Sequence, residues 1–282
     1  MRWRDQRQSS NVDDQRGVSG RGLAVGGGLG SLLLIGLALL FGVDPRNFLD
    51  TGLQQTAPGT QSSRPLSPKE EELKQFTAVI LGSTEDVWND IFRRSGQQYR
   101  EPKLTLFTDQ VRSACGNASA ATGPFYCPAD ERVYLDLAFF DELRTRFQSP
   151  GDFAQAYVIA HEVGHHLQQM LGTMDKVNAA QKRMSEAQAN QLSVRLELQA
   201  DFYAGVWAYY AQKKGLLESG DMEEALRAAT AIGDDRLQKE AQGYVVPDSF
   251  THGTSEQRVR WFRKGFESGD MRQGDTFSVR VP

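Results

Sequence analysis

Two histidines four positions apart constrain the fold of this chain more than any other feature. They occur in His161-Glu162-Val163-Gly164-His165. On a helix they lie one turn apart on the same face, so both imidazoles reach one metal ion. Glu162 is rotated by about 100° from His161, which places its carboxylate beside the ion, where a general base takes a proton from a bound water. A metal site here needs a further ligand from elsewhere in the chain.

The sequence around this motif predicts a buried helix. Residues 153–160 are mostly apolar and contain no helix breaker, residues 149–152 supply a helix start, and Gly172 supplies a stop. Gly164 has no side chain, so it permits the close approach of another element. Three of the four histidines in the chain fall within residues 161–166. A chance motif on a surface would not need such a setting.

A second fragment, Glu197-Leu198-Gln199-Ala200-Asp201, offers the third ligand. It lies within residues 179–214, which predict one long helix because good helix formers dominate and proline is absent. Carboxylates in the apolar part of this helix are costly to bury unless they bind a metal or a hydrogen-bond partner. We therefore predict that Glu197 is the third ligand of one zinc ion, whose fourth position stays open. Asp201, one turn further, is predicted to accept the outer N–H of a ligand histidine.

These two fragments resemble those of the gluzincin metallopeptidases, in which two histidines and one glutamate hold zinc. More closely, the chain resembles the bacterial neutral zinc metallopeptidase family, which has an N-terminal membrane segment. The resemblance extends over essentially the whole chain, through Met1-Arg2-Trp3-Arg4, the Cys115/Cys127 region, both fragments and Thr251-His252-Gly253-Thr254-Ser255. It implies that His161, His165 and Glu197 bind zinc and that Glu162 is the catalytic base. The gap between the motifs is longer than in thermolysin and no Asn precedes Glu197, which implies a compact variant of that fold.

The two other histidines have different expected roles. His166 points about 100° away from His165, so we expect a packed or surface histidine. His252 lies in a loop before a predicted helix with Thr254 or Ser255 as its N-cap. It resembles the gluzincin residue that stabilises the oxyanion formed during peptide hydrolysis. An ordinary loop histidine fits equally well, and Arg258 and Tyr244 are alternatives for the role.

The N-terminal part of the chain predicts a membrane anchor. Residues 23–43 contain no charge and no proline, and as a helix they would span roughly 30 Å, the thickness of a bilayer core. Arg2, Arg4, Arg7, Arg16 and Arg21 precede this run, against three aspartates, so the positive-inside rule places the N-terminus in the cytoplasm. A cleaved signal peptide is the alternative, but its apolar core is usually shorter and no clean cleavage site follows.

This organisation predicts four regions: a cytoplasmic tail (1–22), a signal anchor (23–43), a flexible linker (44–68) and a metallopeptidase domain (69–282). Residues 50–68 are rich in Thr, Gln, Ser, Pro and Gly, as linkers are. The domain would lie in the periplasm or outside the cell, attached to the inner membrane. The only two cysteines, Cys115 and Cys127, are expected to form a disulfide there.

The expected fold class is helix-rich α+β, a zincin-like domain with a small antiparallel or mixed sheet. Residues 68–94 and 220–243 have helical patterns, and residues 103–107 and 132–136 predict strands. By the gluzincin resemblance, the second strand is expected to be the sheet edge that pairs with an extended peptide.

The sequence thus predicts a membrane-anchored zinc endopeptidase acting on peptides or unfolded protein segments. The net charge of −4 and the lack of a sustained basic block exclude nucleic acid as an expected partner. Two alternatives stay open. One is a non-hydrolytic, zinc-stabilised envelope scaffold or adaptor, and the other is hydrolysis of a cell-wall amide. The sequence predicts no oligomeric state.

Overall fold

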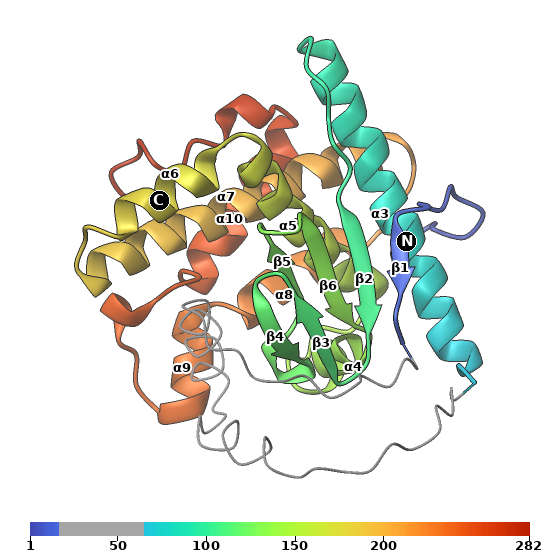
Figure 1. Cartoon of the computed structure of the whole chain (residues 1–282), viewed down its shortest axis with the longest axis horizontal. Helices are drawn as coiled ribbons and strands as arrows, with labels where there is room; N and C mark the ends of the chain where they lie inside the picture. The colour runs from blue at the N-terminus through green and yellow to red at the C-terminus, as the bar shows by residue number, and fades with distance from the viewer. Residues whose placement is uncertain (17–64) are drawn as a thin grey trace.

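The computed structural model describes residues 1–16 and 65–282, which pack into one folded unit (Figure 1). At its centre lies α5 (Asp152–Met170), the helix that carries the histidine motif, as the sequence predicted. From Phe153 to Gly164 every residue of α5 except Gln155 is buried. The elements that pack against it are helices α3 (Pro68–Arg94), α7 (Glu186–Lys213) and α8 (Asp221–Ala231) and strands β5 (Phe125–Cys127) and β6 (Arg132–Asp136). Burial on this scale fixes the positions of the motif side chains relative to the rest of the fold.

The helices around α5 largely follow the predicted pattern. Helix α3 confirms the helix predicted at residues 68–94, and Ser67 and Glu70 form a reciprocal capping box at its start. The other helices among the described residues are α4 (Ala138–Thr145), α6 (Thr173–Gln181), α7 (Glu186–Lys213), α8 (Asp221–Ala231), α9 (Asp234–Gln242) and α10 (Ser255–Ser268), and the 3-10 turns are η2 (Ala120–Thr122), η3 (Pro247–Ser249) and η4 (Met271–Gln273).

Two predicted helices are interrupted. The helix expected over residues 179–214 breaks between α6 and α7, because Ser185 caps α7 through a capping box with Gln188. The pattern at residues 220–243 forms two helices, α8 and α9, that meet at Gly233. A Cβ at Gly233 would lie 2.4 Å from the backbone nitrogen of Ser255. The chain therefore turns at Gly233 to let the start of α10 approach.

The main sheet has four strands in the order β1-β2-β6-β5. Both predicted strands are present as β2 (Lys103–Phe107) and β6 (Arg132–Asp136), which pair in parallel. The other strands are β1 (Val12–Asp14), parallel to β2, β5 (Phe125–Cys127), antiparallel to β6, and a separate hairpin of β3 (Gln110–Ser113) and β4 (Gly116–Ser119). The predicted helix-rich α+β fold with a small mixed sheet is confirmed.

The prediction that residues 132–136 form a free sheet edge is wrong. Strand β6 is hydrogen-bonded to β2 on one side and to β5 on the other. Its residues 133–136 are all buried. This is expected of an interior strand that has a neighbouring strand on each side and is covered on both faces of the sheet. The outer strand on the side nearer α5 is β5 instead, and β5 itself packs against α5.

The predicted disulfide between Cys115 and Cys127 is present. Cys115 lies in the turn of the β3–β4 hairpin and Cys127 ends β5. Both sulfurs pack into a small second core with Phe107, Val111 and Tyr134. The bond therefore fastens the hairpin to the outer strand of the main sheet.

Residues 1–16 belong to the same folded unit as residues 65–282, so the predicted division into a separate tail and a domain starting at residue 69 needs correction. Strand β1 pairs with β2, and the Met1 ammonium lies 3.0 to 3.4 Å from carboxylates of Asp152, Glu218 and Asp221. The predicted anchor at residues 23–43 lies outside the described residues. Within residues 1–16 and 65–282, no helix is both long enough and apolar enough to cross a bilayer.

Helices α7 and α10 cross at two glycines. A Cβ on Gly205 would lie 2.0 Å from the carbonyl oxygen of Phe262, and one on Gly265 would lie 2.0 Å from that of Phe202. Such distances are far inside van der Waals contact, so neither position accepts a side chain without separating the helices. The crossing matters for the site described below, because α7 and α10 each contribute buried charged groups to it.

We predict that Gly205→Ala destabilises the protein by roughly 1–3 kcal/mol, the usual range for an overpacked interior. Gly265→Ala should have a similar effect because the two positions face each other. Urea denaturation followed by circular dichroism measures the change. The control is Gln191→Ala on the exposed side of α7, expected within about 0.5 kcal/mol of the parent. Equal stability of Gly205→Ala and the control would contradict the tight crossing.

Candidate metal centre

Three side chains predicted as metal ligands converge at one point between α5 and α7. His161 Nε2 lies 3.2 Å from one oxygen of Glu197, and His165 Nε2 lies 3.4 Å from the other. Two donor atoms bound to one zinc ion at about 2.0 Å in tetrahedral geometry lie roughly 3.3 Å apart. The donor set of two imidazoles and one carboxylate, with these separations, fits a zinc ion.

The close approach of α7 to α5 depends on the glycine inside the motif. A Cβ on Gly164 would lie 2.9 Å from the carbonyl oxygen of Ala200 and 3.0 Å from its Cα. Ala200 stands between Glu197 and Asp201 on α7. The expectation that Gly164 permits a close approach is therefore confirmed, and the contact brings both carboxylates of α7 to the histidine face of α5.

Asp201 holds the outer nitrogen of His161, as predicted. Its Oδ1 accepts hydrogen bonds from His161 Nδ1 at 2.8 Å and from the Tyr157 hydroxyl at 2.5 Å. Arg258, from α10, donates Nε to the other oxygen at 2.8 Å. Asp201 is fully buried, so these donors and the Arg258 charge offset the cost of placing a carboxylate there. The bond at Nδ1 leaves Nε2 free to face the metal position.

The charges around this point favour a cation. Burial alone would lower the pKa of His161, but the Asp201 and Glu197 carboxylates raise that pKa to about 10. Burial alone would raise the pKa of Glu197, but positive charge at His165, His161 and His252 holds it below the ordinary value for a glutamate. The two opposite shifts have one cause, namely carboxylates and imidazoles crowded around one position. A divalent cation at that position satisfies both.

Gln168, which is not among the site residues predicted from the sequence, orients the second ligand. Its amide oxygen accepts from His165 Nδ1 at 2.9 Å, and its amide nitrogen donates to the Leu196 carbonyl at 2.7 Å. The same nitrogen lies 3.2 Å from Gln199 Oε1. One buried side chain thus connects His165 to the backbone directly before Glu197. A polar residue three positions after a ligand histidine is the signal that could have found it.

Glu162 is buried beside the two ligand histidines. Burial raises the pKa of its carboxyl above the ordinary value, and the charges of His165 and His161 partly oppose this rise. The raised pKa of Glu162 lies closer to neutral pH, and a general base works best when its pKa is near the working pH. Its position next to His161 on α5 matches the role that the sequence predicted.

His252 is held by a buried aspartate that the sequence did not identify. Asp234 accepts the backbone N–H groups of Thr251, His252 and Gly253 at 2.6 to 3.0 Å. Its other oxygen lies 3.1 Å from His252 Nδ1. Burial alone would lower the pKa of His252, but the hydrogen bond and the charge of Asp234 raise it, and Glu197 adds to the rise. Asp234 therefore fixes both the loop and the imidazole, and His252 and Glu197 influence each other electrostatically.

Neither alternative to His252 is placed for its role. Arg258 is 2% exposed and its guanidinium is bound to Asp201 on the Nδ1 side of His161, opposite the donor atoms that converge. Tyr244 is 62% exposed. The packing of Gly253 against Val194 and Leu198 of α7 instead places the His252 loop beside the turn that carries Glu197.

His166 is a packed structural residue, one of the two outcomes expected for it. It is fully buried, donates Nε2–H to the Arg100 carbonyl at 2.6 Å, and accepts at Nδ1 from the Tyr126 hydroxyl at 3.1 Å. Burial lowers its pKa, so the neutral ring is favoured. Since Tyr126 belongs to β5, this bond holds the outer strand against α5 next to His165.

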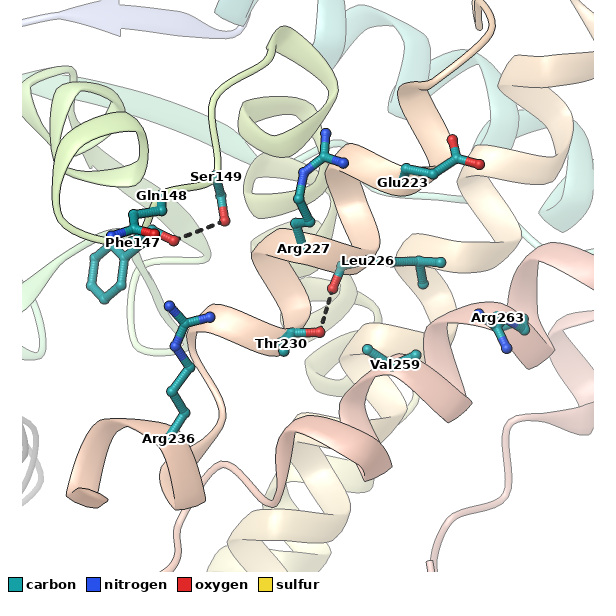
Figure 2. Close-up of a pocket in the computed structure, with 10 residues that line it drawn as sticks. All are labelled: Phe147, Gln148, Ser149, Glu223, Leu226, Arg227, Thr230, Arg236, Val259 and Arg263. Carbon is teal, nitrogen blue, oxygen red and sulfur yellow. Dashed lines mark hydrogen bonds between the residues drawn. The ribbon is translucent and has the colours of Figure 1, made fainter. Parts of the chain in front are cut away.

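A cavity of about 590 Å³ lies elsewhere, between α8, α10 and the loop before α5 (Figure 2). Its lining includes three arginines, Arg227, Arg236 and Arg263, around Leu226 and Val259. It shares no residue with the ligands, with Glu162 or with His252. The chemistry of the site is therefore not located in this cavity.

A protein-family model matches nearly the whole chain. The model of a family described as "putative neutral zinc metallopeptidase" matches residues 1–277. That span begins at residue 1, so it includes the N-terminal segment as well as both metal-ligand fragments.

Two relatives, from different bacterial species, are similar to this chain over most of their length. The chain is 50% identical over 293 aligned positions to the uncharacterized protein YpfJ of Escherichia coli (strain K12), covering 100% of both chains. It is 41% identical over 259 positions to the uncharacterized protein Rv2575 of Mycobacterium tuberculosis, covering 86% of this chain and 85% of the relative. No solved structure matches the chain.

We predict that Gln168→Ala weakens zinc binding roughly 10- to 100-fold, the usual effect of removing a group that orients a metal ligand. The reason is that His165 loses its acceptor and can rotate away from Glu197. Competition with a chromophoric chelator measures the affinity, and the cobalt(II) spectrum reports the coordination geometry. Gln169→Ala on the same helix is the matched control. Equal zinc affinity in both variants would show that Gln168 does not position the ligand.

Proposed function

The chain belongs to this family of neutral zinc metallopeptidases, and on that premise we propose that it hydrolyses peptide bonds in peptides or unfolded protein segments. The observation that carries the proposal is the convergence of His161, His165 and Glu197 beside a buried glutamate outside the ligand set. A purely structural zinc site closes all four positions with protein ligands. Here the described residues supply three such ligands from two helices, so the fourth coordination position would be open to a reacting water.

His161, His165 and Glu197 would hold one zinc ion. When bound, zinc supplies a Lewis acid that polarises the scissile carbonyl and makes the attacking water more acidic. Glu162 takes a proton from that water and then delivers it to the leaving amine. The raised pKa of Glu162 suits both steps, because the group must first accept and then release a proton near neutral pH.

His252 stabilises the oxygen that becomes negatively charged when water attacks. Its Nδ1 is fixed by Asp234, which leaves Nε2–H available as a donor. The Asp234 charge raises the pKa of His252, so the imidazole keeps its positive charge to higher pH than an ordinary histidine. This assigns His252 the oxyanion role and Asp234 the task of positioning it.

Strand β5 is the proposed site where the substrate backbone pairs. It is the outer strand of the sheet beside α5, and Tyr126 ties it to His166, the residue after the ligand His165. Backbone pairing with an outer strand gives affinity with little dependence on side chains. This supports a broad preference for extended peptides and unfolded segments.

We place the site outside the cytoplasm, attached to the inner membrane through residues 23–43. The Cys115–Cys127 disulfide supports an oxidising compartment. The attachment rests on the apolar sequence of residues 23–43 alone.

Glu162→Gln should abolish cleavage while zinc stays bound. Loss of the general base should lower kcat by at least about 10²- to 10⁴-fold. Zinc content by mass spectrometry and cleavage of a panel of denatured proteins and quenched peptides measure the two effects. Glu186→Gln, an exposed residue at the start of α7, is the control and should cleave normally. If the parent protein binds zinc but cleaves nothing in the panel, the scaffold alternative is favoured; cleavage of peptidoglycan fragments alone favours the cell-wall amide.

His252→Gln should lower kcat by roughly 10²- to 10³-fold with little change in zinc content, as expected for loss of an oxyanion donor. A His with a raised pKa is charged below that pKa and neutral above it, so activity should fall as pH rises through it. Asp234→Asn removes the charge that raises the pKa, and the alkaline limb of kcat/KM should move to lower pH. An alkaline limb unchanged in both variants would exclude His252 as the group responsible.

A further inference from the structure

Residues 1–16 are bound along the folded unit, in contact with α3, with β2 and with residues 216–221. Arg2 N donates to the Leu216 carbonyl at 2.8 Å, Ser9 N donates to the Ala78 carbonyl at 2.9 Å, and Leu104 N donates to the Asn11 carbonyl at 2.9 Å. Trp3 is 8% exposed and packs edge-on against Phe76 with ring centroids 5.4 Å apart. The segment ends by adding β1 to the edge of the main sheet (Figure 1).

The unit contains a buried carboxylate whose partners all come from this segment. Glu85 on α3 is 1% exposed. It lies 2.8 Å from the Arg7 guanidinium and 2.8 Å from Asn11 Nδ2, and it accepts a hydrogen bond from the Ser9 hydroxyl. Without residues 1–16 this buried charge would lose these partners, which is strongly destabilising. The bound segment is therefore what stabilises the buried carboxylate of Glu85.

Helix α3 also carries a glycine that the segment requires. A Cβ on Gly82 would lie 2.9 Å from the Arg7 carbonyl oxygen and 3.1 Å from Ser9 N. Glycine inside a helix is less favourable than alanine, and here it allows two backbones to touch. Helix α3 thus has a surface that fits residues 1–16, although the two are more than 50 residues apart in the sequence.

The four arginines of the segment are paired with acidic groups. Arg2 pairs with Glu218, Arg4 with Glu72, Arg7 with Glu85 and Asp86, and Arg16 with Asp14. These are four of the five charges that predicted a cytoplasmic N-terminus. Ion pairs with the domain account for Arg2, Arg4 and Arg7, and Arg16 pairs within the segment while donating to the Glu70 carbonyl. These four charges therefore no longer indicate orientation.

The segment leaves the unit where the rest of the chain enters it. Arg16 Nη1 donates to the Glu70 carbonyl at 3.0 Å, and Lys74 lies 3.1 Å from Asp14. Arg16 and the first turn of α3 are therefore neighbours. A bilayer core about 30 Å thick cannot separate groups that are in hydrogen-bond contact.

We propose that residues 1–16 and the catalytic unit at 65–282 lie on the same side of the membrane, with the N-terminal segment as a structural part of the enzyme. This replaces the arrangement predicted from the sequence, in which residues 23–43 cross the bilayer once, with the N-terminus inside and the domain outside. The inference is independent of zinc and of peptidase activity, because it rests on the contacts of residues 1–16 with the rest of the folded unit, chiefly with α3 and β2.

Single-cysteine labelling of the full chain in cells tests the proposal. Both native cysteines are in the disulfide, so an introduced cysteine is the only free thiol. Gln8→Cys reports on the segment and Glu240→Cys on the domain, and both positions are exposed. A membrane-impermeant maleimide should label both in intact spheroplasts, or both only after permeabilisation. Labelling of one position before permeabilisation and of the other only afterwards would overturn the proposal.

A cross-link tests the contact directly. Asp13 and Thr105 are register partners in β1 and β2, and adjacent strands place Cα atoms within the range a disulfide spans. The double variant Asp13→Cys/Thr105→Cys should cross-link in the purified full chain under mild oxidation. Asp13→Cys/Glu240→Cys is the control and should not. Equal, low cross-linking in the two variants would show that the segment is not bound at β2, whether or not the protein is active.

Discussion

The buried carboxylate of Asp201 is the interaction on which the site depends. It accepts from His161 and Tyr157 on α5 and from Arg258 on α10, while belonging to α7 itself. Burying a carboxylate away from water costs several kcal/mol unless an opposite charge and hydrogen bonds compensate. Three helices must therefore stay in fixed positions to satisfy it. Because one of its donors is His161, the geometry that satisfies Asp201 is also the geometry that directs Nε2 toward Glu197.

Such a network forms only where helix backbones approach closely, and glycine makes this possible at each crossing. Gly164 lets α7 approach α5 at Ala200, and Gly205 and Gly265 let α7 approach α10. Side chains at these positions would separate the helices by more than a hydrogen bond tolerates. Loss of packing at the α7–α10 crossing should thus disturb the orientation of His161, although neither glycine contacts it. Stability and metal geometry are coupled through the same contacts.

Local sequence patterns were sufficient to predict much of this arrangement. The spacing of His161 and His165 requires one helical face, and the acidic pair one turn apart in an apolar stretch identifies Glu197 and Asp201. The helix at 68–94 and the strands β2 and β6 follow from periodicity and composition in the same way. All these features depend on neighbours within a turn or a strand, which a single sequence contains.

The remaining features depend on contacts between distant parts of the chain. Nothing near residue 234 indicates that Asp234 will hold His252, and nothing near residues 12–14 indicates a strand partner at 104–106. The strongest case is the arginines before residue 17. As a local pattern they satisfy the positive-inside rule, which counts basic residues near a membrane span. Carboxylates of the folded unit pair with Arg2, Arg4 and Arg7, and Arg16 pairs with Asp14. The same charges therefore serve packing, and orientation must be decided by where their partners lie.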